Sequence, residues 1–459
     1  MTASEAVQKG FCSPDIPGHL WHTAGLPDGA LVFKRFLYTL IMYLGTPIIL
    51  YRLASRGLRY RDYFARWRER FGFFPAPDIK DSIWIHAVSV GEVNAAVPLI
   101  EALMERHADH PFVVTTITPT GSERVVHLFG ERVFHVYLPY DLPASVRRFL
   151  DRVRPRMGVI LETEIWPNLY FECDARKIPL VIVNGRLSER SLRGYRPVWS
   201  LARSALRRAH EVAAQSHADA RRFEVLGAEP ERVTIAGNLK FDMSVSAHWL
   251  TGGMAMRKAW GLARPVWIAA STHEGEELSV FKAHLEVLRR FPDALLLIAP
   301  RHPERFRAVE QTGRHLGFSV GVRSIDEAPS SAMQCFVIDT MGELMNYFAA
   351  VDVAFVAGSL VPIGGHNVLE PAALAKPVLV GPLTFNFAEI TRTLVKDGGA
   401  MRVKNAEALG IAVNDLLADT VRRQRMGMAA RQVFERERGA VIRTMQVLDR
   451  VYAETTPGR

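Results

Sequence analysis

From residue 80 onward, short apolar runs rich in β-branched residues alternate with longer amphipathic segments. Between the runs, stretches such as 93–107 and 144–154 have the 3.6-residue period of a helix. Alternating strands and helices predict right-handed βαβ units and a doubly wound parallel sheet. The runs of the first series are SIWIHAV (82–88), FVVTTIT (112–118), VFHVYL (133–138), MGVILET (157–163), PLVIVN (179–184) and HEVAAQ (210–215).

The alternation is interrupted between residues 237 and 264, where several glycines occur and no clear strand is visible. A chain of 459 residues also favours two domains. We therefore predict two Rossmann-like lobes with a cleft between them, and ligands bind such sheets at the carboxyl ends of the strands. The runs of the second series are PVWIAAS (265–271), ALLLIAP (294–300), CFVID (335–339), VAFVAG (353–358) and PVLVGP (377–382).

The longest apolar run, residues 36–51, has no charged side chain and is bounded by Arg35 and Arg52. A helix needs roughly 20 apolar residues to span a bilayer, with a lower limit of about 17, and Pro47 would weaken this helix near its end. A short transmembrane anchor, an interfacial helix and a buried core helix all stay open, and the arginine and aromatic edges favour membrane attachment. Because the larger basic cluster follows the run, the positive-inside rule places the lobes in the cytoplasm.

The formal net charge of +9 is concentrated in one short segment. Residues 34–75 hold nine basic side chains, opposed only by Asp62 and Glu69, and so carry +7 of the total. This distribution indicates a localised basic collar beside the apolar run and argues against a nucleic-acid-binding domain. The odd number and wide spacing of the cysteines favour a reducing compartment, without disulfides. They are Cys12, Cys173 and Cys335.

These patterns divide the chain into four expected parts. The helical, charged stretch 420–452 at the end of the second lobe could return to brace the first lobe. The parts are a loose leader (1–31), a membrane-attachment helix with the basic collar (32–75), an N-terminal lobe (76–245) and a C-terminal lobe (246–459).

Two acidic sites follow predicted strands of the first lobe. Glu92 lies at the turn after the strand 82–88, where Gly91 opens the turn. A glutamate there also complements the dipole of the following helix, so its position alone does not make it catalytic. Glu162 and Glu164 follow another apolar strand. Carboxylates on two separate loops suit a general base and an electrostatic partner.

Two loops of the second lobe are candidates for binding an anion. Arg301 comes directly after the strand 294–300 and Pro303 marks a helix start, and an arginine beside a helix N-terminus suits a phosphate. Thr340 is the expected N-cap of a later helix, with residues 341–343 in its first turn. The backbone amides there would bind a base or a phosphate, although helix capping explains Thr340 nearly as well.

A glycine-rich loop, GGHN (364–367), runs into a predicted helix that carries Glu370 on its first turn. Glycines allow close approach to an anion, the helix N-terminus favours a phosphate, and a carboxylate can accept from both ribose hydroxyls. Together with Arg301, the loop indicates a nucleotide site. The sequence lacks a P-loop and a GxGxxG pattern after its first strand, which argues against ATP hydrolysis and hydride transfer. The sequence also has no aspartate pair or histidine cluster that would suggest a site for a divalent metal.

Eight motifs support a resemblance to a known family. They are HAVSVGE (86–92), ETEIWPN (162–168), NGRLSERS (184–191), GNLKFD (237–242), ASTHEGEE (270–277), APRHPER (299–305), DTMGEL (339–344) and GGHNVLEPA (364–372). In this order they resemble the Kdo transferases of Gram-negative bacteria, which transfer 3-deoxy-D-manno-octulosonic acid (Kdo) from CMP-Kdo to the lipid A precursor. The likeness extends from about residue 33 to near the C-terminus.

The resemblance implies roles for individual residues. Glu92, in SVGE, would be the proton acceptor that deprotonates the acceptor hydroxyl. Glu162 and Lys240 would stabilise the transition state, although the sequence alone would make Lys240 a surface lysine at a hinge. The residues implied in CMP binding are Pro300, Arg301, Met341, Gly342, Glu343, Asn367, Val368, Leu369 and Glu370.

The resemblance also implies an α/β fold of GT-B type, and an inverting transfer that needs no metal or other cofactor. The implied partners are CMP-Kdo at the second lobe, the anionic lipid A precursor at the first lobe, and the bacterial inner membrane, with the lobes on its cytoplasmic face. No nucleic-acid partner is expected. The alternatives are another GT-B glycosyltransferase of the cytoplasmic face that uses a UDP-sugar, a nucleotide-sugar epimerase or hydrolase, and a lipid-binding scaffold.

Overall fold

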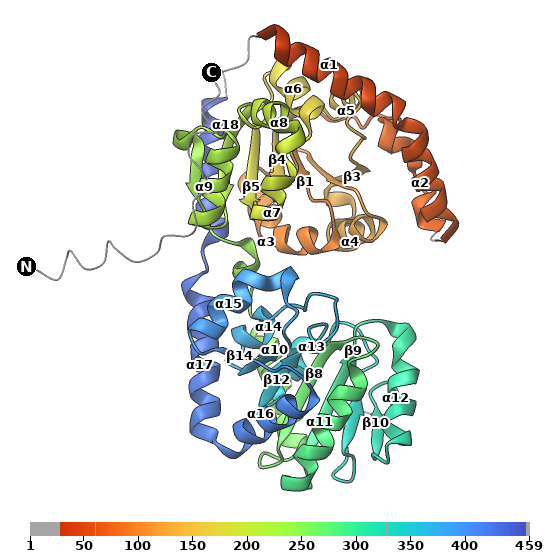
Figure 1. The fold of residues 1–459 in the computed structure, drawn as a ribbon, viewed down its shortest axis with the longest axis vertical. Helices are drawn as coiled ribbons and strands as arrows, with labels where there is room; N and C mark the ends of the chain where they lie inside the picture. The colour runs from red at the N-terminus through yellow and green to blue at the C-terminus, as the bar shows by residue number, and fades with distance from the viewer. Residues whose placement is uncertain (1–27, 60, 327, 456–459) are drawn as a thin grey trace, which may run out of the picture. The chain divides into compact units, whose positions relative to one another are not determined.

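The computed structural model describes residues 28–59, 61–326 and 328–455, and most of the expected leader lies outside these ranges. Contacts divide the chain into two compact units (Figure 1). The first unit extends to Ala236 and also includes the segment that begins at Arg443, whereas the second unit is Gly237–Ile442. The sequence placed this division after residue 245, a few residues later.

The first unit is built on a seven-stranded parallel sheet with the order β3-β2-β1-β4-β5-β6-β7. Its central strands are buried along almost their whole length, because apolar β-branched residues fill both faces of a sheet that is covered by helices on either side. The strands are β1 (Ser82–His86), β2 (Phe112–Thr116), β3 (Phe134–Tyr137), β4 (Pro155–Leu161), β5 (Leu180–Gly185), β6 (Ala209–Ala214) and β7 (Val233–Ile235).

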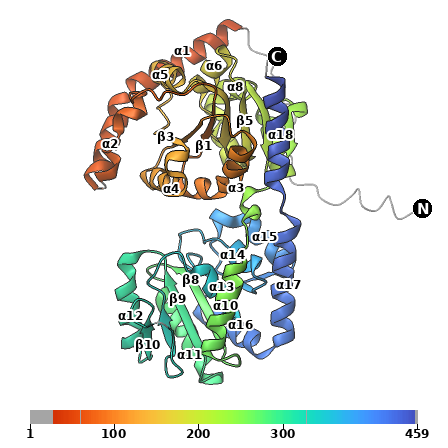
Figure 2. The same cartoon turned by 180° about the vertical axis from the view of Figure 1, so that it is seen from behind.

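Helices follow the strands of this sheet and cover both of its faces (Figures 1 and 2). The largest side chains of the core, among them Trp84, Phe149, Tyr170 and Phe223, are fully buried between the helices and the sheet. The helices are α3 (Val90–Arg106), α4 (Pro119–Phe129), α5 (Pro143–Val153), α6 (Pro167–Ala175), α7 (Glu189–Gly194), α8 (Trp199–Leu206) and α9 (His217–Leu226).

The second unit repeats the plan with a sheet of order β10-β11-β9-β8-β12-β13-β14, again parallel throughout. Every strand run read from the sequence is confirmed in the two sheets. The strands are β8 (Val266–Thr272), β9 (Leu295–Pro300), β10 (Val320–Val322), β11 (Cys335–Val337), β12 (Val353–Val356), β13 (Val378–Val380) and β14 (Ala400–Arg402).

The helices of the second unit enclose its sheet in the same way (Figure 1). The interval 237–264, which had no clear strand, contains a 3-10 turn at Leu239–Asp242 and the helix α10. The helices are α10 (Ala247–Trp260), α11 (Glu277–Arg290), α12 (Phe306–His315), α13 (Leu344–Ala350), α14 (Leu369–Ala373), α15 (Ala388–Lys396), α16 (Ala406–Ala418) and α17 (Thr420–Arg436).

The apolar run 36–51 does not form one continuous helix. It is divided between α1 (Asp28–Leu44) and α2 (Thr46–Arg59), which are bent by 43°. The break lies at Gly45, and Pro47 occupies the first turn of α2, where its missing N–H is harmless. Within the described part of the chain, no single helix is long and apolar enough to cross a bilayer, although the bent pair passes the same test together.

The charged helical end of the chain is also two helices, α17 and α18 (Ala440–Glu454), because Gly439 between them has a φ of 92°. Asp242 accepts the N–H groups of Gly439 (2.6 Å) and Val441 (2.5 Å), which ties the 3-10 turn at 239–242 to the start of α18. Phe241 packs in a core cluster of the second unit. These contacts explain why the second unit begins at Gly237 and not after residue 245.

Candidate functional site

The two acidic loops lie at the switch point of the first sheet. β1 and β4 are neighbours in the sheet but not in the sequence, and β1 pairs with β4 in parallel. Glu92 stands in the first turn of α3, directly after β1, and Glu162 directly follows β4. The point at which strand order reverses is where doubly wound sheets bind ligands. The structure therefore places Glu92 and Glu162, both predicted as candidate catalytic residues, on neighbouring loops at the expected ligand-binding edge of the sheet.

Glu92 is held by the turn that precedes its helix. Its carboxylate accepts the N–H of Val88 (2.8 Å) and the hydroxyl of Ser89 (3.2 Å). Burial raises the pKa of Glu92 to about 7, and the charge of Glu162 acts in the same direction. The Val88 N–H lowers the pKa, and Glu164 adds a smaller increase. A carboxyl group with this pKa exchanges its proton close to neutral pH, which is the property of a general base.

Glu162 has an unusual backbone conformation. Its φ of 57° lies in the left-handed region, which costs a non-glycine residue on the order of 1 kcal/mol or more. Its N–H donates to Val183 on the neighbouring strand β5 (3.0 Å), and the hydroxyl of Thr163 donates to the carbonyl of Arg186. Glu164 accepts the indole N–H of Trp166 (2.7 Å). The loop is thus fixed on both sides of a strained residue, as is common at functional sites.

Lys240 belongs to the second unit, in the 3-10 turn at 239–242. Its N–H donates to the side chain of Asn238 (3.0 Å), and its Nζ lies 5.1 Å from the centre of the Phe387 ring. A lysine against an aromatic face keeps its charge while part of its stem is covered. The turn is fixed by Asp242, so Lys240 is not on a loose hinge segment.

The candidate CMP-binding residues follow three strands of the second sheet, β9, β11 and β12, and β8 lies between β9 and β12 in the sheet. Pro300 ends β9 and is buried, and Arg301 follows it at the surface, with its N–H donating to Thr272 of β8 (2.9 Å). In the described part of the chain, the guanidinium of Arg301 forms no ion pair or hydrogen bond with another side chain. It is therefore available to an anion.

The loop after β11 differs from the expected helix cap. The helix α13 begins at Leu344, its N-cap is Glu343, and Thr340 does not cap it. Thr340 instead donates its hydroxyl to Glu343, whose carboxylate also binds Arg323 at 3.1 and 3.2 Å. Residues 341–343 therefore form a bend before the helix, in which Gly342 has a φ of 89°. A ligand would meet an irregular backbone segment here and not a helix N-terminus.

The glycine-rich loop after β12 also departs from the expectation. The helix α14 has only five residues, so it has little macrodipole to offer a phosphate. Asn367 organises its start, since its side chain accepts the N–H of Leu369 (3.1 Å) and donates to Glu370 (3.1 Å). Val368 and Leu369 are buried, so their side chains are not exposed to a ligand. Burial raises the pKa of Glu370 to about 7, although Asn367 and Arg301 lower it.

The sequence did not single out a group of side chains beside these loops. His273 follows β8, His302 follows β9 and His366 precedes α14, and the three rings lie together. His273 and His366 are 93 positions apart in the sequence, and only the fold brings them within 2.8 Å. Their motifs, ASTHEGEE and GGHN, contributed to the resemblance but gave no reason to pair them. Among the residues that the structure describes, no group of three or more His, Cys, Asp or Glu is arranged to hold a metal ion.

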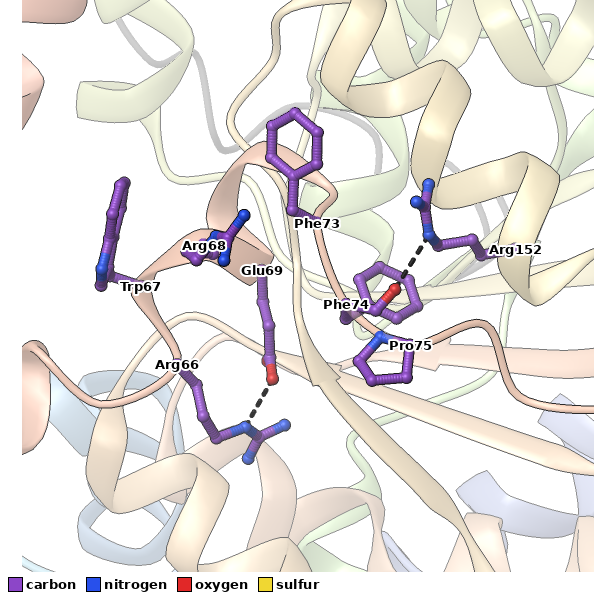
Figure 3. Close-up of a pocket in the computed structure, with 8 residues that line it drawn as sticks. All are labelled: Arg66, Trp67, Arg68, Glu69, Phe73, Phe74, Pro75 and Arg152. Carbon is purple, nitrogen blue, oxygen red and sulfur yellow. Dashed lines mark hydrogen bonds and ion pairs between the residues drawn. The ribbon is translucent and has the colours of Figure 1, made fainter.

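The basic segment of the first unit borders a cavity of about 580 Å³ (Figure 3). Arg66 is paired with Glu69 at 2.6 Å, and Arg152 donates to the carbonyl of Phe74 (3.0 Å). Arg70 is buried, so it does not belong to the exposed collar that the sequence predicted. The side chain of Arg68 is exposed and has no ion-pair partner in the described residues. The lining residues are Arg66, Trp67, Arg68, Glu69, Phe73, Phe74, Pro75 and Arg152.

A second cavity, of about 360 Å³, adjoins the acidic loop after β4. Its wall is mostly apolar, and Tyr38 of α1 closes one side, where it donates to the buried Asp141 (2.9 Å). The cavity therefore connects the N-terminal helix with the loop that carries Glu164. The lining residues are Tyr38, Thr163, Glu164, Ile165, Trp166, Pro167, Tyr195, Val198, Leu201 and Ala202.

Known proteins resemble both the sequence and the fold. The family profile described as 3-deoxy-D-manno-octulosonic-acid transferase (kdotransferase) matches residues 65–243. The 3-deoxy-D-manno-octulosonic acid transferase of Haemophilus influenzae is 41% identical over 420 residues, which cover 90% of this chain and 98% of that protein. The enzyme of the same name from Bordetella pertussis is 36% identical over 432 residues, or 90% and 99% of the two chains.

A solved structure of UDP-GlcNAc 2-epimerase from Neisseria meningitidis, bound to UDP-GlcNAc, superposes with a TM-score of 0.56. It is 14% identical, and the match covers 80% of this chain and 100% of that one, so it bears on the fold alone. Two doubly wound parallel units and this likeness confirm the expected GT-B type of fold. On the strength of the two full-length relatives, the chain belongs to the 3-deoxy-D-manno-octulosonic acid transferase family.

Proposed function

We propose that this protein transfers Kdo from CMP-Kdo to a sugar hydroxyl of the lipid A precursor, with inversion at the anomeric carbon and without a metal ion. Membership of the transferase family supports the reaction class. The observation that carries the assignment of the active site is the environment of Glu92. A carboxyl group whose pKa is raised to about 7, at the switch point of the acceptor unit, can take up a proton during turnover.

In the proposed reaction, Glu92 accepts the proton of the acceptor hydroxyl as its oxygen forms a bond with the anomeric carbon of Kdo. The bond between that carbon and the phosphate oxygen breaks, and CMP leaves with the electron pair. Attack on the side opposite to the leaving group inverts the centre. Glu162 and Lys240 stabilise the charges that develop, with Lys240 acting on the departing phosphate or the Kdo carboxylate.

The donor is assigned to the loops of the second unit. Arg301 supplies a guanidinium for the phosphate, and Glu370 supplies a carboxylate for the ribose hydroxyls. The bend at Met341, Gly342 and Glu343 offers backbone groups to the cytosine, as do Pro300 and the segment 367–369. These loops follow β11, β9 and β12 at the same edge of the parallel sheet, with only β8 between β9 and β12, which supports a single nucleotide site.

The acceptor and the membrane are assigned to the N-terminal part of the first unit. α1 and α2 carry exposed apolar side chains at helical spacing, including Phe33, Leu37 and Leu44. The cavity beside Arg68 combines a free guanidinium with aromatic walls, a combination suited to a phosphorylated lipid at an interface. Attachment to the cytoplasmic face of the inner membrane follows from this assignment.

The direct test is to incubate the purified protein with a CMP-Kdo-generating system and the lipid A precursor and to analyse the lipid by mass spectrometry. An increase by the mass of one or more Kdo residues supports the proposal, and an unchanged lipid contradicts it. Thermal stabilisation by CMP but not by UDP supports the donor assignment. Stabilisation by UDP alone would favour the alternative of a transferase or epimerase that uses a UDP-sugar.

A further inference from the structure

His273 and His366 form a hydrogen-bonded pair at the switch point of the second sheet. β8 and β12 are neighbours in the sheet but not in the sequence, and the two histidines lie on the loops that follow them. Their Nε2 atoms are 2.8 Å apart, and the ring planes differ by only 1° with centroids 5.0 Å apart. This is the geometry of two coplanar rings joined edge to edge by one N–H···N hydrogen bond.

The number of protons in such a pair is fixed by its geometry. One proton lies between the two Nε2 atoms, and a neutral pair holds one more, which must be on the outer Nδ1 of one ring. The pair therefore presents one N–H donor at one end and one lone pair at the other. Burial lowers the pKa of His366 to about 4, assisted by His273, Arg301 and His302, and the pKa of His273 is lowered as well. The pair is therefore neutral at physiological pH.

A buried carboxylate holds the two loops in place. Glu276 is fully buried and accepts the N–H groups of His273 (3.1 Å), Gly358 (2.5 Å) and Leu360 (3.3 Å). Gly358 has a φ of 68°, and a Cβ there would lie 2.8 Å from the ring of His366. The contacts of Glu276 connect the loop after β8 to the loop after β12. The ring of His366 fits against Gly358 because this residue has no side chain. Glu276 is therefore a positioning residue for the pair.

A cation adjoins the pair. Arg301 follows β9, the strand beside β8, and its N–H donates to Thr272, the residue before His273 (2.9 Å). Its positive charge lowers the pKa of His273, His366 and Glu370. His302 packs edge-on against His273 at a centroid distance of 5.2 Å. A guanidinium beside a fixed N–H donor is a suitable receptor for a phosphate oxygen, because each supplies a hydrogen bond to the same anion. Among the described carboxylates, Glu276 is the one that hydrogen-bonds to the backbone of the pair, through the N–H of His273.

We propose that the His273–His366 pair, positioned by Glu276, donates its outer N–H to the phosphate group of the donor nucleotide beside Arg301. This inference rests on the proposed function and adds two phosphate-binding residues to it. The shared proton couples the tautomers of the two rings. The ring that contacts the phosphate carries a proton on Nδ1, so the other ring must donate its Nε2–H to it. The bound anion thereby fixes which ring donates, and no imidazolium is required.

The test compares the binding of CMP and of cytidine by isothermal titration calorimetry. Cytidine lacks the phosphate, so the ratio of the two affinities reports on phosphate contacts alone. We expect His273→Leu and His366→Leu each to reduce the affinity for CMP about tenfold, the size of one strong hydrogen bond to an anion, and to change the affinity for cytidine less than twofold. His315, which is exposed on α12, is the control, and His315→Leu should change neither.

His273→Asn and His366→Asn are the second variants, because an asparagine amide nitrogen can replace the Nδ1 of whichever ring donates to the phosphate. We expect the variant of the donating ring to recover part of the lost affinity for CMP, whereas a purely structural role would predict no recovery. Equal losses for CMP and cytidine, or an unchanged CMP affinity in both leucine variants, would overturn the proposal. A loss that appears only in the KM for CMP-Kdo would assign the pair to the Kdo carboxylate and would overturn the phosphate assignment. If the wild-type protein binds CMP no better than cytidine, the donor assignment itself fails.

Discussion

At neutral pH the two protonation states of Glu92 are close in free energy, because burial and the charge of Glu162 offset the hydrogen bonds that favour its ionised form. This balance suits proton transfer and also makes Glu92 expensive to ionise in the folded protein. A group whose pKa is raised on folding contributes stability below its unfolded pKa, and that contribution is lost as the pH rises through the folded pKa. The same residue therefore connects activity with stability.

The substitution Glu92→Gln is expected to reduce kcat by a factor of 10² to 10⁴, the usual contribution of a general base, and to leave CMP affinity unchanged. Wild-type kcat/KM should rise with pH toward a plateau above about 7, since the ionised carboxylate is the active form. Steady-state transfer assays across pH 5.5–8.5 check both statements. Transfer at the wild-type rate by the variant would refute the assignment of the base.

The stability of Glu92→Gln should change with pH relative to the wild type. Glutamine never ionises, so the variant lacks the cost of burying a charge above pH 7. From pH 5 to pH 8, the unfolding free energy of the variant should increase relative to that of the wild type by on the order of 1–2 kcal/mol. This range allows for the partial exposure of the carboxylate. Urea unfolding at the two pH values measures this difference, and a gap that stays constant would contradict it.

Backbone strain at Glu162 allows a second experiment at the residue scale. Glycine tolerates a φ of 57°, so Glu162→Gly should raise the unfolding free energy by about 0.5–1 kcal/mol while it lowers transfer. Lys177 is a matched control, since it has a φ of 55° at an exposed position after α6. Lys177→Gly should give a similar gain in stability and keep full activity. A loss of stability in Glu162→Gly would show that the strain is not stored there.

The positions of Glu92, Glu162 and Arg301 directly after parallel strands were predicted correctly, because the strands themselves were evident in the sequence. Their roles at this edge, where such sheets bind ligands, stay predictions. Residue-level prediction of position was successful here. It failed where a local hydrogen bond redirects the chain. Thr340 has the residue type of an N-cap, but its hydroxyl binds Glu343 and the helix starts later. The pairing of His273 with His366 depends on strand order, which local sequence does not contain.

At the scale of elements, the central strands were evident from the sequence and the short edge strands were not. β7, β10 and β14 have three residues each and lie at sheet edges, so they have neither the length nor the continuous apolar pattern of a buried strand. The run 36–51 was predicted to form one helix that Pro47 weakens near its end, yet the break lies at Gly45. The apolar pattern predicted the buried central strands correctly, but it did not predict a helix bend at a single glycine.

The exposed apolar stripe on α1 and α2 predicts binding to lipid surfaces. Both views show α2 standing away from the rest of the first unit (Figures 1 and 2), and Leu44 and Leu58 are 70% and 83% exposed. We expect the double substitution Leu44→Ser and Leu58→Ser to weaken binding to anionic vesicles at least tenfold, since each change removes a large apolar side chain from the interface. Vesicle co-sedimentation measures it.

Leu262, in the second unit, is 73% exposed and serves as the control for that experiment. Leu262→Ser should leave vesicle binding unchanged. If the double variant sediments like the wild type, the stripe does not contact lipid, and the basic cavity beside Arg68 would have to account for any binding. The salt dependence of binding then separates the two sources, because contacts with Arg68 weaken with ionic strength and apolar contacts do not.

At the scale of the whole molecule, the end of the chain belongs to the first unit although it follows the second in sequence. Figure 2 shows α17 running along the second unit and α18 along the first. Val447, Leu448 and Val451 of α18 are buried, and Arg450 forms a two-bond ion pair with Glu211 of β6 at 2.9 and 3.0 Å. The core of the first unit is therefore completed by a helix that follows the second unit in the sequence.

This arrangement predicts that a substitution in the last helix destabilises the first unit selectively. Leu448 is fully buried, and Leu448→Ala should cost about 2–4 kcal/mol through lost burial and the cavity left behind. Ile442, 66% exposed near the start of the same helix, is the control, and Ile442→Ala should cost less than about 0.5 kcal/mol. Hydrogen exchange resolved by segment should show faster opening of β1 to β6 in Leu448→Ala, and little change in β8 to β13. Equal acceleration in both sheets would mean that the two units unfold as one, because a helix that stabilises only the first core cannot by itself expose the second.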